Sequence, residues 1–212
     1  MSIITSSIMR RSGPMARKAR TEMIEETRQK LVAAARRQFG SVGYAETVMD
    51  DLTAQAGLTR GALYHHFGDK KGLFLAVVQA IDSEMDAHLA DITASTADDW
   101  EAFAARCRGY LIMMTEPQAQ RILLRDSPSV LGAEYLRASK LACISWMTGA
   151  LQALMAQRRI AVAEPESLAH LINGGLMDAA LWVAHHPEKD VGLEQALVSL
   201  NLLLNGLRST AV

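Results

Sequence analysis

The amino-acid sequence predicts an all-α fold, in which a small three-helix unit precedes a larger helical bundle. Half of the 212 residues are hydrophobic, alanine and leucine are abundant, and there are only 5 prolines. No stretch shows the alternation of β-branched and polar residues that is typical of a half-buried strand. Apolar residues recur instead at spacings of three and four, which indicates amphipathic helices. The length allows a core-forming domain and a smaller companion.

Charge divides the chain unevenly. Residues 1–75 hold 12 Lys and Arg against 7 Asp and Glu, whereas residues 76–212 hold 10 against 16. Residues 1–20 carry five positive charges and no acidic residue, which favours a disordered basic arm. We therefore expect a basic arm (1–20), a basic module (21–75) and an acidic helical body (76–212). Such asymmetry suits a module that faces nucleic acid.

The first helix is expected over residues 22–40. Its early acidic and later basic residues complement the helix dipole. Leu31, Ala35 and Phe39 form the inward stripe, and Gly40 and Gly43 stop the helix.

Residues 47–67 read as two short helices joined by a tight turn. Thr47 is predicted to cap the first, with Asp50 completing a partial capping box. Leu52 and Ala56 share its buried face, and Gly57 supplies the left-handed residue of the turn.

The second short helix has a polar outer face. Thr59 caps it, and Leu63 and Phe67 anchor it to the core. The pattern is that of a helix-turn-helix, whose second helix lies in the DNA major groove. The outward positions are Thr59, Arg60, Gly61, Ala62, Tyr64, His65 and His66.

Four of these positions, Thr59, Arg60, Gly61 and His65, are candidates for the base edges, with Arg60 suited to a bidentate guanine contact. Small residues at 61 and 62 permit close backbone approach. We expect Tyr64, His66 and Lys70 to contact phosphates, the last from a helix N-terminus. Adjacent histidines point apart on a helix and no other ligand stands at metal spacing, so no metal site is predicted.

About twenty positions in register carry a family resemblance. They are Thr27, Arg28, Ala34, Phe39, Gly43, Tyr44, Thr47, Asp51, Leu52, Ala56, Gly57, Leu58, Thr59, Arg60, Gly61, Leu63, Tyr64, His66, Phe67, Lys70 and Leu73. Over roughly residues 15–75 they resemble the N-terminal signature of TetR/AcrR-family transcriptional regulators. Val48 and Thr53 depart from it. The resemblance implies operator DNA as a partner, a homodimer and a small-molecule effector, and adds Arg28 as a candidate phosphate contact and Thr47 to the DNA-binding set.

The next helix, over residues 70–91, is expected to link the two parts. Leu73, Phe74, Val77 and Ile81 would bind its front half to the DNA module, and Met85 and Leu89 would reach into the second domain. A ligand that tilts this rod would change the spacing of two recognition helices, provided that it binds the two states unequally.

Five further helices are expected, over residues 97–115, 117–125, 133–158, 164–185 and 191–208. The last carries leucines at a 4-3-4-3 spacing, which is a heptad seam. Small residues on the helix before it allow close approach, so we predict a four-helix dimer interface. The alternative is that both stripes face their own core. The predicted interface residues are Gly175, Ala179, Leu193, Leu197, Leu200, Leu204 and Leu207.

A ligand pocket is predicted between the middle helices, because methionine and aromatic side chains there would adapt to an apolar molecule. Arg121 and Arg125 share a helix face that suits an anionic ligand, although Asp126 could pair with one of them. These side chains could equally be ordinary core. The candidates are Tyr110, Met113, Met114, Arg121, Arg125, Trp146, Met147, Asn173, Met177 and Trp182.

Other function classes find little support in the sequence. Cys107 and Cys143 lack zinc spacing and suit buried thiols of a reduced, cytoplasmic protein, with a redox-sensing pair as the alternative. No apolar run approaches the length of a membrane span, and the first residues are too short and polar for a signal peptide. No catalytic or phosphate-loop spacing is present, so neither an enzyme nor a cofactor is expected.

The sequence thus predicts a cytoplasmic, homodimeric TetR-like regulator, a repressor released from its operator by a small, largely apolar effector. The alternative is a ligand-independent DNA-binding protein whose C-terminal domain only dimerises.

Overall fold

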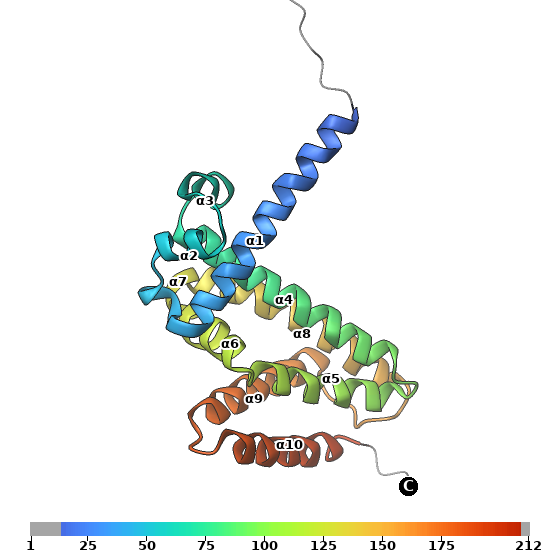
Figure 1. The fold of residues 1–212 in the computed structure, drawn as a ribbon. Helices are drawn as coiled ribbons and strands as arrows, with labels where there is room; N and C mark the ends of the chain where they lie inside the picture. Colours follow the sequence, from blue (N-terminus) through green and yellow to red (C-terminus); the bar gives the residue numbers. More distant parts are fainter. Residues whose placement is uncertain (1–13, 209–212) are drawn as a thin grey trace, which may run out of the picture.

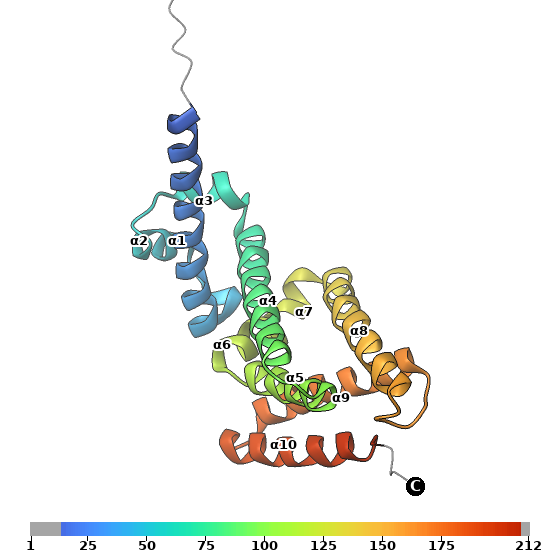
Figure 2. The ribbon, with the colours of Figure 1, turned by 90° about the vertical axis from the view of Figure 1, so that its right-hand side faces the viewer.

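A computed structural model describes residues 14–208 and shows two helical modules joined by one long helix (Figures 1 and 2). Among the described residues the one β feature is an isolated bridge between Ile160 and Arg208, so the predicted all-α fold is confirmed. The elements are α1 (Pro14–Glu46), α2 (Met49–Gln55), α3 (Arg60–Phe67), α4 (Lys70–Ala94), α5 (Asp99–Met114), α6 (Pro117–Ala119), the π-helical η1 (Gln120–Asp126), α7 (Ser127–Leu131), α8 (Ala133–Ala156), α9 (Pro165–His185) and α10 (Lys189–Asn205).

Helix α1 begins at Pro14, earlier than predicted. Residues 14–20 are therefore helical where the sequence led us to expect a disordered arm. Proline is favourable in the first helical turn, and the Met, Ala, Arg and Lys residues that follow are strong helix formers. Their charge suggested disorder, but extending an existing helix costs little once it is nucleated. Residues 1–13 of the predicted arm lie outside the described residues.

The end of α1 turns sharply at Gly43, where φ is +88° and ψ is 170°. The prediction that Thr47 caps the next helix, α2, is wrong. Val48 is the N-cap of α2, without a side-chain hydrogen bond, and Thr47 is 3% exposed. The Thr47 hydroxyl donates instead to the Gly43 carbonyl at 2.8 Å, so it stabilises the turn rather than the helix start.

The module formed by α1, α2 and α3, which the sequence predicts to face DNA and which we call the DNA-proximal module, packs around an aromatic cluster. The rings of Phe39 and Tyr44, at the end of α1, lie 5.1 and 5.0 Å from the ring of Phe74 on α4. Leu52 from α2 and Leu63 from α3 are fully buried beside them. Apolar residues spaced by four on each short helix thus meet in one core, as the sequence predicts.

Helix α4 contacts α1 and α3 at its start, and α5 and α7 further along. Leu73, Val77 and Ile81 are buried in its first half and Met85 and Leu89 in its second, so one rigid element belongs to both modules. Figure 2 shows it descending from the α1–α3 module to the α5 end of the bundle.

The segment after α5 differs from the predicted short helix. Instead of closing at residues 126–128, the chain continues through α6, η1 and α7 to Leu131. The Ser127 hydroxyl donates to the Ile122 carbonyl at 2.8 Å, five residues back, which fits the wider π turn. Pro128 does not break the helix because it stands in the first turn of α7.

The remaining helices match the predicted positions within a few residues. Of the residues predicted to face inward on α8, Ile144, Met147, Leu151 and Leu154 are buried, whereas Leu141 is exposed. Helices α9 and α10 lie together at the end of the molecule opposite α3 (Figure 1).

The aromatic cluster gives a test of the core. Phe74→Ala should lower the free energy of unfolding by about 3–5 kcal/mol, because it removes a buried ring that contacts two others. Urea unfolding measures the loss. Val48→Ala, at a 53% exposed position in the same module, should change it by less than about 0.5 kcal/mol. Equal losses in the two variants would contradict this packing.

Candidate DNA-binding surface and ligand cavity

The predicted recognition helix stands at the surface. Thr59 caps α3 and its hydroxyl accepts from the Ala62 amide at 3.2 Å. Gly57 has φ +65°, which gives the turn between α2 and α3 its left-handed residue. Leu63 faces the core. The exposed positions are Thr59, Arg60, Gly61, Tyr64 and His65, whereas Ala62 and His66 are half-buried.

Arg60 is held by a carboxylate of the preceding helix. Its Nε lies 2.9 Å from Oδ1 of Asp50 on α2, with both side chains more than half exposed. An exposed pair contributes little stability, but it restricts the rotamer of Arg60. The ion pair uses Nε, and the two terminal nitrogens of the guanidinium lie further along the side chain.

The side chains of Lys70 and Arg28, which the sequence predicts to contact phosphates, each have a partner within the protein. The Lys70 ammonium donates to the Ala45 carbonyl at 3.1 Å and lies 4.8 Å from the centre of the Tyr44 ring. The Arg28 guanidinium lies 5.8 Å from the Phe67 ring. Both side chains thus stand on the junction of α1 with the helix-turn-helix. Thr47, also predicted to contact DNA, is buried and its hydroxyl is engaged, so we leave it out of the interface.

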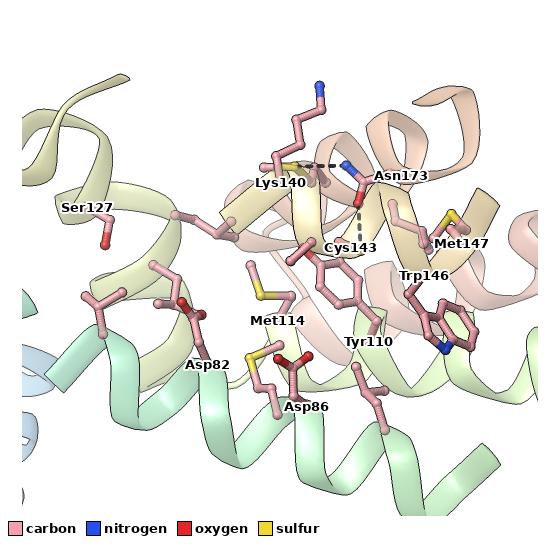
Figure 3. A pocket seen from close by; sticks show the side chains of 18 of the residues that line it. Asp82, Asp86, Tyr110, Met114, Ser127, Lys140, Cys143, Trp146, Met147 and Asn173 are labelled. Carbon is pink, nitrogen blue, oxygen red and sulfur yellow. Dashed lines mark hydrogen bonds between the residues drawn. The ribbon is translucent and has the colours of Figure 1, made fainter. Parts of the chain in front are cut away.

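A cavity of about 740 Å³ lies in the second module, between α4, α5, η1, α7, α8 and α9 (Figure 3). Its wall contains six of the ten predicted effector-binding residues: Tyr110, Met114, Trp146, Met147, Asn173 and Met177. Met113, Arg121, Arg125 and Trp182 do not line it.

The polar groups of the cavity are only partly paired with one another. The Tyr135 hydroxyl donates to Asp82 at 2.9 Å, joining α8 to α4. Arg106 lies 4.0 Å from Asp86 and 4.1 Å from the centre of the Trp146 ring. These acidic and basic residues were missed by the sequence reasoning. The four-residue spacing of Asp82 and Asp86, which puts both on one face of α4, was the available signal.

Burial affects the titrating groups of the cavity. Loss of solvent is the main cause that raises the pKa of Asp82, the neighbouring Asp86 raises it further, and the hydrogen bond from Tyr135 opposes both. Burial raises the pKa of the Tyr110 and Tyr135 hydroxyls, and the pKa of the Cys107 thiol to about 12. At neutral pH, Cys107 is therefore a thiol, which is unreactive compared with a thiolate.

Arg121, predicted as an anion ligand, has a different role. Its guanidinium donates to the Val42 carbonyl at 2.5 Å, and Asp126 accepts from the Tyr44 amide at 2.7 Å. Both side chains leave η1 on the side of α1. Leu123 and Leu124, on the same turn, line the cavity. Arg125 is exposed and does not line the cavity, so the predicted anchor for an anionic ligand is wrong. The segment η1 instead connects the cavity to the DNA-proximal module.

The predicted heptad seam of α10 faces its own domain for the most part. Leu204 is buried, and Leu193, Leu197, Leu200 and Leu207 pack against the core. The exposed apolar side chains lie elsewhere on α9 and α10: Leu171, Leu181, Trp182, Val191, Val198, Leu202 and Leu203. Helix α10 carries leucines on several sides. The leucines that pack against its own core therefore have the same spacing as those of an interface between subunits.

A groove nevertheless runs between the two last helices. Gly175, Ala179, Leu200, Leu204 and Leu207 from the predicted interface line it, together with Trp182 and Leu203. Five of the seven predicted interface residues therefore line a groove on these two helices, and their role in a dimer stays a prediction. Leu193 and Leu197 do not belong to the groove.

Two further observations concern residues 14–208. No three His, Cys, Asp or Glu side chains come together there as a metal ion would require. Over the same range no helix combines the length and apolar character of a membrane crossing.

An exposed recognition helix in one module and a cavity in another, joined by a shared helix, are the features of a DNA-binding regulator of transcription. Comparison with known proteins agrees. Residues 31–77 match the family model described as bacterial regulatory proteins, tetR family, and residues 100–207 match the model of the tetracyclin repressor-like C-terminal domain. The chain belongs to the TetR family of transcriptional regulators.

Three similar proteins illustrate the range of this family. A crystal structure of a TetR-family transcriptional regulator from Pectobacterium atrosepticum is 50% identical, with a TM-score of 0.78 over 90% of this chain and 98% of that one. The transposon Tn10 TetC protein of Escherichia coli is 27% identical over 76% of this chain and 81% of its own length. The HTH-type transcriptional repressor AcnR of Corynebacterium glutamicum is 43% identical over 25% of this chain and 28% of its own.

The cavity gives a pKa prediction. Tyr135→Phe should raise the pKa of Asp82 further, because it removes the hydrogen bond that stabilises the carboxylate. A ¹³C NMR titration of the Asp82 carboxyl in both proteins measures the shift. Tyr110→Phe, which leaves that hydrogen bond in place, is the control. A lower pKa in the Tyr135 variant would contradict the arrangement.

Proposed function

We propose that this chain is a homodimeric, cytoplasmic repressor that binds operator DNA through α3 and releases it when an effector enters the cavity. The observation that carries the proposal is the double role of η1. Leu123 and Leu124 line the cavity, while Arg121 and Asp126, on the same turn, bond the end of α1. A change of cavity shape therefore acts directly on the module that holds α3.

DNA binding is assigned to the exposed face of the helix-turn-helix. Thr59, Arg60, Gly61 and His65 would face the bases, with Ala62 allowing the backbone close to them. Tyr64, His66, Lys70 and Arg28 would lie toward the phosphates. Residues 1–75 carry a net charge of +5, and the resulting attraction to the duplex does not depend on base sequence.

Dimerisation is assigned to α9 and α10. Leu171, Val198, Leu202 and Leu203 leave most of their apolar surface exposed on these two helices, and a dimer interface would bury such side chains. A two-fold dimer would place two α3 helices on half-sites about 34–36 Å apart. The relative AcnR is a transcriptional repressor by name, and repression by this chain is part of the proposal.

The ligand-independent alternative predicts a filled second domain. The 740 Å³ cavity favours an effector instead, because native interiors seldom leave such a volume without a purpose. The family consists of DNA-binding regulators, and we assign no catalytic step or cofactor to the cavity. Its residues would bind and position a ligand.

Contacts with bases and with phosphates should respond differently to mutation. Arg60→Ala should cost about 1–3 kcal/mol on the operator and relax the choice of one base pair. Lys70→Ala should weaken specific and random DNA alike and lower the salt slope by about one. Fluorescence anisotropy over a salt series measures both.

Arg137→Ala is a matched control for these variants, since it removes the same single positive charge from an exposed position of α8 in the second module. Equal losses on operator and random DNA for both Arg60→Ala and Lys70→Ala would contradict the division between bases and phosphates.

The dimer surface can be tested in the same way. Leu202→Glu with Leu203→Glu should give monomers that bind operator at least tenfold more weakly, because two side chains 75% and 72% exposed in one chain would be buried in the dimer. Sedimentation velocity measures the association state. Val162→Glu, 88% exposed in the loop before α9, should leave it unchanged. A dimeric double variant would place the interface elsewhere.

A further inference from the structure

The charged residues of the cavity wall are Asp82, Asp86, Arg106 and Lys140. Arg106 lies 4.0 Å from Asp86, so the charges of these two residues offset each other. The Arg106 guanidinium also stacks on Trp146. The Lys140 side chain leaves α8 with its ammonium pointing away from both carboxylates (Figure 3). Asp82 is therefore the charge of the wall that no cation offsets.

Asp82 is also partly withdrawn from water. Its hydrogen-bond partner is the Tyr135 hydroxyl, a neutral group, at 2.9 Å. A carboxylate removed from solvent is costly unless an opposite charge or several donors compensate it. The rise of its pKa on burial agrees with this geometry. A ligand that brought a positive charge to Asp82 would recover part of that cost.

The wall around this carboxylate is soft and aromatic. Met85, Met114, Tyr110 and Trp146 line the same cavity as Asp82, and Figure 3 shows Met114, Tyr110 and Trp146 in it. Methionine adapts to irregular apolar shapes, and aromatic faces attract cations. Trp146 already accepts the Arg106 guanidinium in this way.

We propose that the effector is a lipophilic organic cation whose positive charge lies against Asp82 and whose apolar body fills the methionine- and aromatic-lined cavity. The inference rests on the proposed function and deepens it. It replaces the anionic ligand suggested by Arg121 and Arg125, which do not reach the cavity.

The position of Asp82 also links recognition to response. It belongs to α4, the helix shared by both modules, and its carboxylate joins α4 to α8 through Tyr135. A bound cation competes with the Tyr135 hydroxyl for the carboxylate. Effector binding thus weakens a contact that holds α4 in its present position.

Two ions of nearly the same size and shape but opposite charge test the proposal. Tetraphenylphosphonium and tetraphenylborate are titrated into the full-length protein by isothermal calorimetry. The cation should bind at least tenfold more tightly than the anion. Asp82→Asn should weaken cation binding about tenfold, which corresponds to about 1.4 kcal/mol, and leave anion binding unchanged or tighter.

Two further variants control for folding and for general charge. Asp86→Asn removes an exposed carboxylate already opposed by Arg106, and should change cation affinity less than Asp82→Asn does. Tyr135→Phe frees the Asp82 carboxylate without removing it, so cation binding should be kept or become tighter. If Asp82→Asn does not fold, the ratio of the two ions' affinities in Tyr135→Phe still tests the role of the carboxylate.

The cation proposal is overturned if neither ion binds, if the anion binds as tightly as the cation, or if the ratio of the two affinities is the same in Asp82→Asn. Operator release is measured separately by anisotropy with whichever ion binds. An ion that occupies the cavity without weakening the binding of operator DNA would count against the proposed function. The proposal that the cavity prefers organic cations would still stand.

Discussion

The structure depends most on two hydrogen bonds between η1 and the end of α1. Arg121 donates to the Val42 carbonyl and Asp126 accepts from the Tyr44 amide. They satisfy main-chain groups that a helix end leaves without partners. Because Tyr44 also packs on Phe39 and Phe74, the same two bonds fix the aromatic core of the DNA-proximal module. The cavity and the recognition helix are therefore parts of one mechanical system.

Two rigid elements join the module that contains the cavity to the DNA-proximal module. One is η1, in which Leu123 and Leu124 line the cavity while Arg121 and Asp126 bond the end of α1. The other is α4, which has buried residues from Leu73 to Leu89 and carries Asp82 halfway. Packed interiors switch between discrete arrangements rather than deforming continuously. A ligand that binds one arrangement of η1 and α4 more tightly than the other would therefore change the position of α3.

Local patterns predicted the helical fold and the exposed face of α3 well. Leu52, Leu63 and Gly57 behave as their spacing and chemistry indicate, since those features depend on near neighbours in the chain. Tertiary choices were harder. Leu197 and Leu202 have similar apolar character, and the sequence did not show which one faces the core. The partners of Arg121 come from a segment some eighty residues away, and no local rule reveals them.

The absent side chain of Gly43 has a consequence for how this family member can change. Its backbone has φ +88°, and a Cβ placed there would come within 2.5 Å of the Arg121 guanidinium. Any other residue would meet both a strained backbone and an occupied space. The space that a side chain at position 43 would take is thus filled by Arg121, which bonds the end of α1. We expect a substitution at position 43 to displace that guanidinium and so to weaken the link between η1 and α1.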